Sequence, residues 1–154
     1  MSPGGEGKIT LKVRTKGYQG TICKSARIYT NDPSNEKMRL SMKGSVKVCI
    51  YLLPRRVSFF GDPDKKIIRK VDIKAMLDRP LTLNPVKFDL KDRLKYKIEE
   101  IQKGRMFRIS FETIPFETIP VTGKMFQGSL KLQTNYPEKP ELVIWIRGRF
   151  AIKD

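Results

Sequence analysis

The sequence predicts an all-β chain of antiparallel β-sandwiches, arranged in tandem as two related copies of which the first is incomplete. Short runs of residues alternate between apolar and polar, as in strands that bury one face. Two stretches about 100 residues apart repeat each other. No window has the 3.6-residue apolar spacing of a helix of normal length, and only residues 74–77 allow a single helical turn.

The internal repeat is clearest at a turn. Thr30–Pro33 (Thr-Asn-Asp-Pro) recurs as Thr134–Pro137 (Thr-Asn-Tyr-Pro), 104 positions later. At the same offset Leu40 matches Ile144, Met42 matches Ile146 and Gly44 matches Gly148. Residues 9–13 match residues 107–111 at an offset of 98, so the second copy holds six more residues, which we place at the duplicated Phe-Glu-Thr-Ile-Pro of 111–120. A period of this size is that of one immunoglobulin-like sandwich.

The expected strands follow in order along the chain. The first copy has strands at 8–13, 21–30 and 38–46, the last two joined by the Asn-Xaa-Pro turn. The alternation continues from Val46 to Leu52, until Pro54 ends it. Further strands are expected around residues 57–59, 67–73, 81–88, 94–98 and 107–111, and on both sides of the turn at 134–137.

These strands place a domain boundary near Val48. Residues 49–154 hold about seven strands, which is a complete sandwich by count. Residues 1–47 hold only the last three strands of another. In the last strand Ile144 and Ile146 should be buried and Arg147 should be exposed, and Lys131, before the turn, should be exposed too.

The charge of the chain is strongly positive. There are 32 Lys and Arg against 16 Asp and Glu, a net charge of +16. This field favours anionic partners, so non-specific binding to a polyanion is expected. Dispersed lysines also keep sheet edges from pairing, and this reading is the one we favour. Tyr96 and Phe107 stand among the cations but should point inward, which leaves them no role as a stacking platform.

Several function classes lack the residues that they need. The chain has no His and only two Cys, so no metal site, cofactor or catalytic group is expected, and the chain is not an enzyme. No run of about 18 apolar residues could span a membrane. The first residues do not have the pattern of a signal peptide, and the signal of an exported parent protein would lie upstream.

Turn and strand features of the first copy resemble a known family. Pro3–Ile9, Gly20, Tyr29–Pro33 and Leu40–Gly44 resemble the bacterial domain-of-unknown-function family 1573, which is similar to Hydin-like and major-sperm-protein-like immunoglobulin folds. Residues 49–150 look like a more diverged member. The resemblance implies tandem sandwiches without known enzymatic activity, commonly in exported, periplasmic or envelope-associated proteins.

Few residues stand out as candidate sites. Cys23 and Cys49 are both out of phase with the apolar positions, so two outward-facing free thiols are expected rather than a bridge. The carboxylate pairs Glu99–Glu100 and Asp62–Asp64 have structural explanations, because neighbours on a strand point to opposite faces and the second pair flanks a turn proline.

The candidate interaction surface is Trp145 with Arg147 and Lys131. An outward Trp beside Arg is typical of a hot spot. Alternatively, the stems of Lys131 and Arg147, or a contact between domains, cover the ring.

The sequence therefore predicts a structural or protein-interaction module with a protein partner. The alternative is a basic module that binds an anionic polymer, either nucleic acid or envelope polysaccharide. The apolar face of residues 8–46 lacks a second sheet, so we also expect self-association through this segment.

Overall fold

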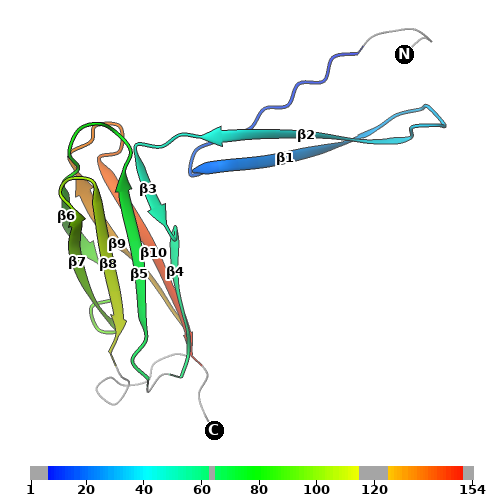
Figure 1. Cartoon of the computed structure of the whole chain (residues 1–154). Coiled ribbons are helices and arrows are strands. Elements are labelled where there is room, and N and C mark those ends of the chain that lie inside the picture. Colours follow the sequence, from blue (N-terminus) through cyan, green and yellow to red (C-terminus); the bar gives the residue numbers. More distant parts are fainter. Residues whose placement is uncertain (1–6, 63–64, 115–124, 151–154) are drawn as a thin grey trace. The chain divides into compact units, whose positions relative to one another are not determined.

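The computed structural model describes residues 7–62, 65–114 and 125–150, and over these residues it contains strands and no helix. The all-β prediction is confirmed. The chain divides into two compact units, Met1–Val48 and Cys49–Asp154, so the division falls beside Val48 (Figure 1).

The second unit is a β-sandwich of two four-stranded sheets. One sheet has the order β4-β10-β9-β6 and the other has the order β3-β5-β8-β7. The strands are β3 (Ile50–Leu53), β4 (Arg56–Gly61), β5 (Ile68–Ala75), β6 (Leu83–Phe88), β7 (Leu94–Gln102), β8 (Met106–Thr113), β9 (Met125–Thr134) and β10 (Glu141–Phe150). These are eight strands instead of the seven expected.

The continuous strand expected from Val46 to Leu52 is not formed. Val46 pairs with Gly20 in the first unit, whereas Ile50 pairs with Ala75 in the second. Between these two ladders the backbone leaves strand geometry at residues 47–49, although the alternation of side chains persists. The chain then changes sheets, because β3 pairs with β5 while β4 runs parallel to β10.

The core of the second unit lies between its two sheets. Ile109 and Phe111 of β8 face Leu130 of β9 and Ile144 and Ile146 of β10, and all five side chains are buried. The predicted burial of Ile144 and Ile146 is confirmed. Alternation supplies this core, since every second residue of a strand points to the same face.

The first unit is a two-stranded antiparallel hairpin of β1 (Gly20–Tyr29) and β2 (Lys37–Val46). The strand predicted at 8–13 is absent, since these described residues pair with no strand. Its counterpart at offset 98 lies in β8, which pairs with β5 and β7. The described part of the first unit holds no equivalent of those two neighbours, and a strand without a ladder partner does not form.

The β1–β2 hairpin matches the β9–β10 hairpin residue by residue. Ala26 pairs with Leu40 as Leu130 pairs with Ile144, and every other pair shared by the two ladders keeps the offset of 104.

The loops of the two hairpins also match bond by bond. Thr30 N donates to Glu36 O at 3.0 Å, and Thr134 N donates to Pro140 O at 2.9 Å. The hydroxyl of each Thr donates to the carbonyl five residues on, at 2.7 and 2.5 Å. The same hydroxyl accepts from the N–H two residues on, in Asp32 and Tyr136, at 3.2 and 3.1 Å. A Thr at the end of the first strand therefore closes both loops.

Candidate interaction surface

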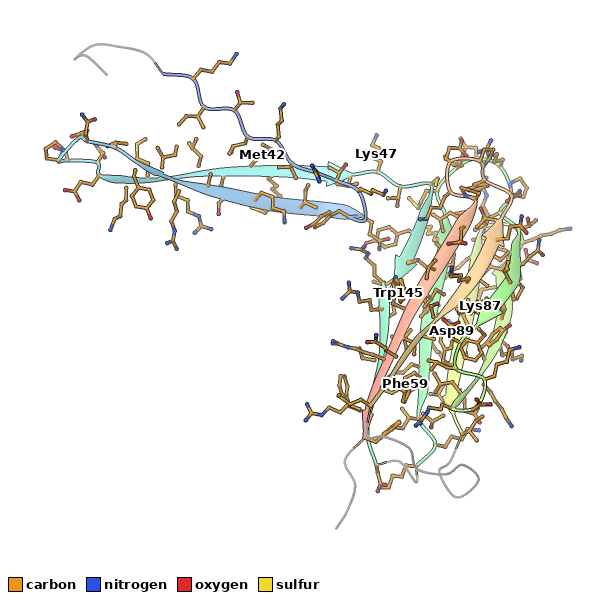
Figure 2. All side chains as sticks on the ribbon, turned by 180° about the vertical axis from the view of Figure 1, so that it is seen from behind. Met42, Lys47, Phe59, Lys87, Asp89 and Trp145 are labelled. Atoms are coloured by element: carbon orange, nitrogen blue, oxygen red, sulfur yellow. The ribbon has the colours of Figure 1, made fainter. Side chains whose placement is uncertain are left out.

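Three large side chains project outward from β10. Trp145, Arg147 and Arg149 alternate with residues that point into the core, and all three are exposed. Trp145 is 58% exposed, and its side chain is labelled in Figure 2. Trp145 and Arg147, the sequence-predicted pair, thus share one face of one strand, two residues apart.

The neighbouring strand β4 adds an aromatic ring and a further arginine to this face. The parallel register places Arg56 opposite Trp145, Ser58 opposite Arg147 and Phe60 opposite Arg149. Phe60 is 53% exposed. Arg147 Nε donates to Ser58 Oγ at 3.1 Å, which fixes its guanidinium above the centre of the surface.

We call this surface the β4/β10 face. It consists of Arg56, Ser58, Phe60, Trp145, Arg147 and Arg149. Among the described residues no ion pair joins its arginines to a carboxylate. Two aromatic rings and three guanidinium groups are therefore presented together to solvent.

Lys131 lies on the same sheet face but one row away from Trp145. It pairs with Val143, whereas Trp145 pairs with Ser129. Lys131 is half-buried, so the prediction that it is exposed is wrong. It has Val143 on one side and Lys87 of β6 on the other, and the neighbouring strands cover part of its stem.

Beyond Lys131 the sheet carries a carboxylate. Asp89 accepts from Ser129 N at 3.1 Å and from Ser129 Oγ at 2.8 Å, and Lys87 Nζ lies 3.1 Å from its other oxygen (Figure 2). The hydrogen bond from the Ser129 hydroxyl, followed by that from Lys87, lowers the pKa of Asp89. Asp89 thus links the end of β6 to β9, and the positive charge of Lys87 balances its negative charge.

The opposite sheet has a different charge pattern. On its outer face Arg108 binds Asp72 through two hydrogen bonds of 2.7 and 3.0 Å, and Lys97 lies 2.8 Å from Glu99. The hydrogen bonds from these cations lower the pKa of Asp72 and of Glu99. Carboxylates are interspersed with the lysines on this face, so its field is partly cancelled, unlike that of the β4/β10 face.

The hairpin of the first unit has a cationic face of its own. On its polar side Arg27 lies opposite Arg39, Lys37 opposite Tyr29 and Lys43 opposite Cys23. Like charges directly across a ladder repel, so this pattern lowers the stability of the isolated hairpin. Behind β1, a shallow pocket of about 350 Å³ is lined by Leu11, Lys12, Val13, Arg14, Tyr18, Lys24 and Ser25.

The two cysteines are both free thiols. Cys23 is exposed on the polar side of the hairpin, as expected. Cys49 is half-buried and packs against the core, so its predicted outward position is wrong. It precedes β3, where the alternation of the strand does not yet apply.

Glu100, a member of one of the two predicted carboxylate pairs, has a structural role. Glu100 accepts a hydrogen bond from Gly104 N at 2.5 Å, inside the β7–β8 turn. Asp64 and the second half of the 111–120 duplication lie outside the described residues. Within the described residues, no cluster of three or more His, Cys, Asp or Glu could hold a metal ion, and no helix is long and apolar enough to cross a membrane.

Sequence reasoning missed four of the six residues of the β4/β10 face, namely Arg149 and the three residues from β4. The run Arg56–Phe60 alternates, and buried Phe59 implies outward Phe60. However, β4 and β10 are separated by about 80 residues and pair in parallel, so local alternation gives no sign that Phe60 lies beside Arg149. Tyr96 and Phe107 point inward as predicted, but the exposed rings of Trp145 and Phe60 were not foreseen as a platform.

Comparison with known proteins shows a likeness in fold. No model of a protein family matches the chain, and no curated protein matches it. A crystal structure of a protein of unknown function from Porphyromonas gingivalis W83 is similar, with a TM-score of 0.52 and 11% sequence identity. The match covers 90% of this chain and 70% of the other. At this identity the likeness shows a shared fold and nothing further about function.

Proposed function

We propose that the chain is a non-catalytic structural and protein-interaction module, formed by one complete and one partial repeat of a tandem immunoglobulin-like array. The observation that carries the proposal is the match between the two hairpins in ladder register and loop hydrogen bonds. Loop type alone fixes the register of a hairpin, so the support comes from the shared register together with the sequence match at the same offset of 104. The resemblance to domain-of-unknown-function family 1573 is part of this proposal.

In the complete unit the matched hairpin is covered on three sides. β9 pairs with β6, β10 pairs with β4, and the other sheet covers the inner face. The corresponding edges of β1 and β2 pair with nothing among the described residues. Met38, Leu40 and Met42 are 42%, 39% and 37% exposed, whereas their counterparts Leu142, Ile144 and Ile146 are buried. The first unit thus keeps an exposed apolar face of the kind that marks a protein interaction site.

Asn31 supports the same conclusion. Its counterpart Asn135 accepts a hydrogen bond from Thr82 N at 2.9 Å and donates to Pro80 O at 3.0 Å. Asn135 therefore clamps the backbone that leads into β6. Asn31 and Asn135 are both exposed, but the described residues of the first unit contain no strand equivalent to β6 for Asn31 to hold. We propose that an extended strand from a protein partner occupies this place.

The first partner to test is a second copy of the chain, joined through residues 8–46. Sedimentation equilibrium at micromolar concentration should show dimers or larger species for the full chain. Leu40→Glu should shift the population to monomer, because it places a charge on the apolar face. Asn31→Ala should weaken association without touching that face.

Leu53→Glu, at an exposed apolar position of β3, is the matched control and should leave association unchanged. A monomeric full chain with well-protected amides in residues 8–46 would contradict self-association, because a lone hairpin is marginally stable in water.

A second candidate function is binding to an anionic polymer, and the β4/β10 face favours it. Its three arginines have no carboxylate partner among the described contacts, while Arg108 on the opposite face is paired. Binding should then be measurable by titration with polyphosphate at low salt and should weaken steeply as salt is added. Replacing Arg56 and Arg147 with Ala should cost more affinity than replacing Lys70 and Lys97 of the opposite face.

A further inference from the structure

We propose that the β4/β10 face binds single-stranded nucleic acid, with bases stacked on Trp145 and Phe60 and phosphates held by Arg56, Arg147 and Arg149. This inference rests on the second candidate function, binding to an anionic polymer, and names the polymer and its site.

The kinds of residue on the face match this ligand. Sequence-tolerant binding of single strands combines a cationic track for the phosphates with aromatic side chains that stack on the bases. Arginine suits the first task, because its planar guanidinium makes bidentate bonds to phosphate and also stacks on rings. All the cations of the face are arginines, and both rings are more than half exposed.

The register places cations next to rings. Arg56 is directly opposite Trp145, and Arg149 is directly opposite Phe60. Each ring therefore has an arginine on the neighbouring strand, whose backbone lies about 4.8 Å away. Arg147 lies between the two pairs and is oriented by Ser58. A base on either ring would have its phosphate within reach of an arginine.

The distance between the rings sets the path of the strand. Trp145 and Phe60 are four residues apart along adjacent parallel strands, or about 14 Å from the usual rise and strand spacing. Neighbouring bases in a stacked strand are only about 3.4 Å apart. The two rings would therefore take bases that are not adjacent, with the intervening phosphates crossing Arg147.

A single strand fits this surface better than a duplex. In a duplex the faces of the bases are already stacked on each other, so exposed rings on a sheet gain nothing from them. The described residues contain no helix that could enter a major groove. The β1–β2 ribbon, with Arg27 opposite Arg39, is the element that could enter a groove. A preference for duplex would thus point away from the β4/β10 face.

Trp145 is the only tryptophan of the chain, so its fluorescence reports directly on the proposed site. Titration of the full chain with an unlabelled twelve-nucleotide oligo(dT) should quench it in a saturable way. A plot of the logarithm of the association constant against the logarithm of the salt concentration should have a slope of about −2, as expected for three phosphates on a single strand. An abasic oligonucleotide of the same length should bind more weakly and quench less.

Variants separate stacking from charge, with binding read by the anisotropy of labelled oligo(dT). Trp145→Ala should lose about 5- to 150-fold in affinity, the effect of one stacked base, and Phe60→Ala should lose a similar amount. Trp145→Phe should recover most of the loss. Ile68→Ala, at an exposed apolar position of β5 in the other sheet, and Lys97→Ala on the opposite face are the controls and should have little effect. Thermal melting should show that each variant is folded.

Each outcome decides the proposal. Equal binding of oligo(dT) and the abasic strand, with Trp145→Ala unchanged, would overturn stacking and leave polyanion binding in place. No binding to either strand or to polyphosphate at low salt would overturn both. Tighter binding to duplex, or stronger quenching by an anionic polysaccharide than by oligo(dT), would overturn the single-strand proposal in favour of that ligand.

Discussion

Gly148 of β10 lies directly opposite Phe126 of β9, and the ring occupies the space that a side chain would need. A Cβ at Gly148 would lie 2.1 Å from Phe126 Cε1, and the ring itself packs between Phe59 and Phe150. At the matching position Gly44, a Cβ would meet Ile22 Cγ1 at 3.9 Å, an ordinary contact. The packing therefore requires a glycine at position 148 but leaves room for a side chain at position 44.

Gly148→Ala should therefore lower the free energy of unfolding by about 1–3 kcal/mol, because the Phe126 ring must move within a packed cluster. Gly44→Ala should change it by less than about 0.5 kcal/mol. Urea denaturation followed by Trp145 fluorescence measures the first, and circular dichroism covers both. Equal effects of the two substitutions would contradict this account of Gly148.

The Asp72–Arg108 pair should make stability depend on acid pH. The hydrogen bonds from Arg108 lower the pKa of Asp72 below its ordinary value. Because the folded pKa lies below the unfolded one, near 3.9, the pair stabilises the protein at neutral pH. This contribution is lost as the pH falls through the folded pKa. Both side chains are about one-third exposed, so solvent reduces the effect.

Asp72→Asn should accordingly cost about 0.5–1 kcal/mol at pH 7. The variant should also lose less stability than the native chain between pH 6 and pH 3. Glu141→Gln is the control, since the described contacts give Glu141 no ion pair. Urea midpoints measured at both pH values test this. A native-like acid response in Asp72→Asn would show that other carboxylates dominate it.

At the residue scale, alternation predicted well where the ladder is regular. Ile144 and Ile146 are buried and Arg147 is exposed as expected, because a period of two leaves no other choice within β10. The exposure of Lys131 and of Cys49 differs from the prediction, for reasons that the pattern of a single strand does not reveal. Neighbouring strands cover the stem of Lys131, and Cys49 precedes the start of its strand.

The β9–β10 loop is an element whose two copies have different surroundings. In the second unit Asn135 clamps Thr82 N and Pro80 O, and Tyr136 is buried with its hydroxyl donating to Arg79 O at 2.5 Å. The first copy has Asn31 and Asp32 at these positions, and both are exposed. The same turn thus supports a tertiary contact in only one of the described units.

Asn135→Ala should cost about 0.5–1.5 kcal/mol of stability, because it removes two hydrogen bonds to the backbone of residues 80 and 82 at a solvent-exposed position. Asn31→Ala should leave the unfolding of the second unit unchanged. Chemical denaturation read at Trp145 isolates that unit, since the chain has no other tryptophan. A loss of the same size in both variants would mean that the two loops are held alike.

At the element scale, the sequence predicted turns and strand cores better than strand pairing. The shared Thr-Asn turn predicted both hairpins correctly. The turn did not predict that residues 8–13 remain unpaired, because the alternation there is regular. The explanation is that the described part of the first unit has no strands equivalent to β5 and β7, the two partners of β8. Nor did the turn show that β4 joins β10, on which half of the candidate site depends.

At the scale of the whole molecule, the two units differ in how they are held together. Every buried apolar side chain described lies between Ile50 and Phe150, whereas the apolar face of the hairpin is open to solvent in this chain. The second unit therefore has a complete core of its own, of the size that folds independently. The described part of the first unit has no comparable core.

Residues 49–154 alone should then fold with the stability of the second unit in the full chain, within about 0.5 kcal/mol, since every buried apolar side chain described belongs to that unit. The fragment should keep the β4/β10 face and any affinity for polyanions that this face supplies. It should lose the self-association proposed for residues 8–46 and sediment as a monomer. Urea denaturation at Trp145 and sedimentation equilibrium on the fragment and the full chain test the three statements separately. An unfolded fragment would show that the hairpin contributes to the core of the sandwich. A fragment that still dimerises would move the self-association surface from the hairpin to the second unit.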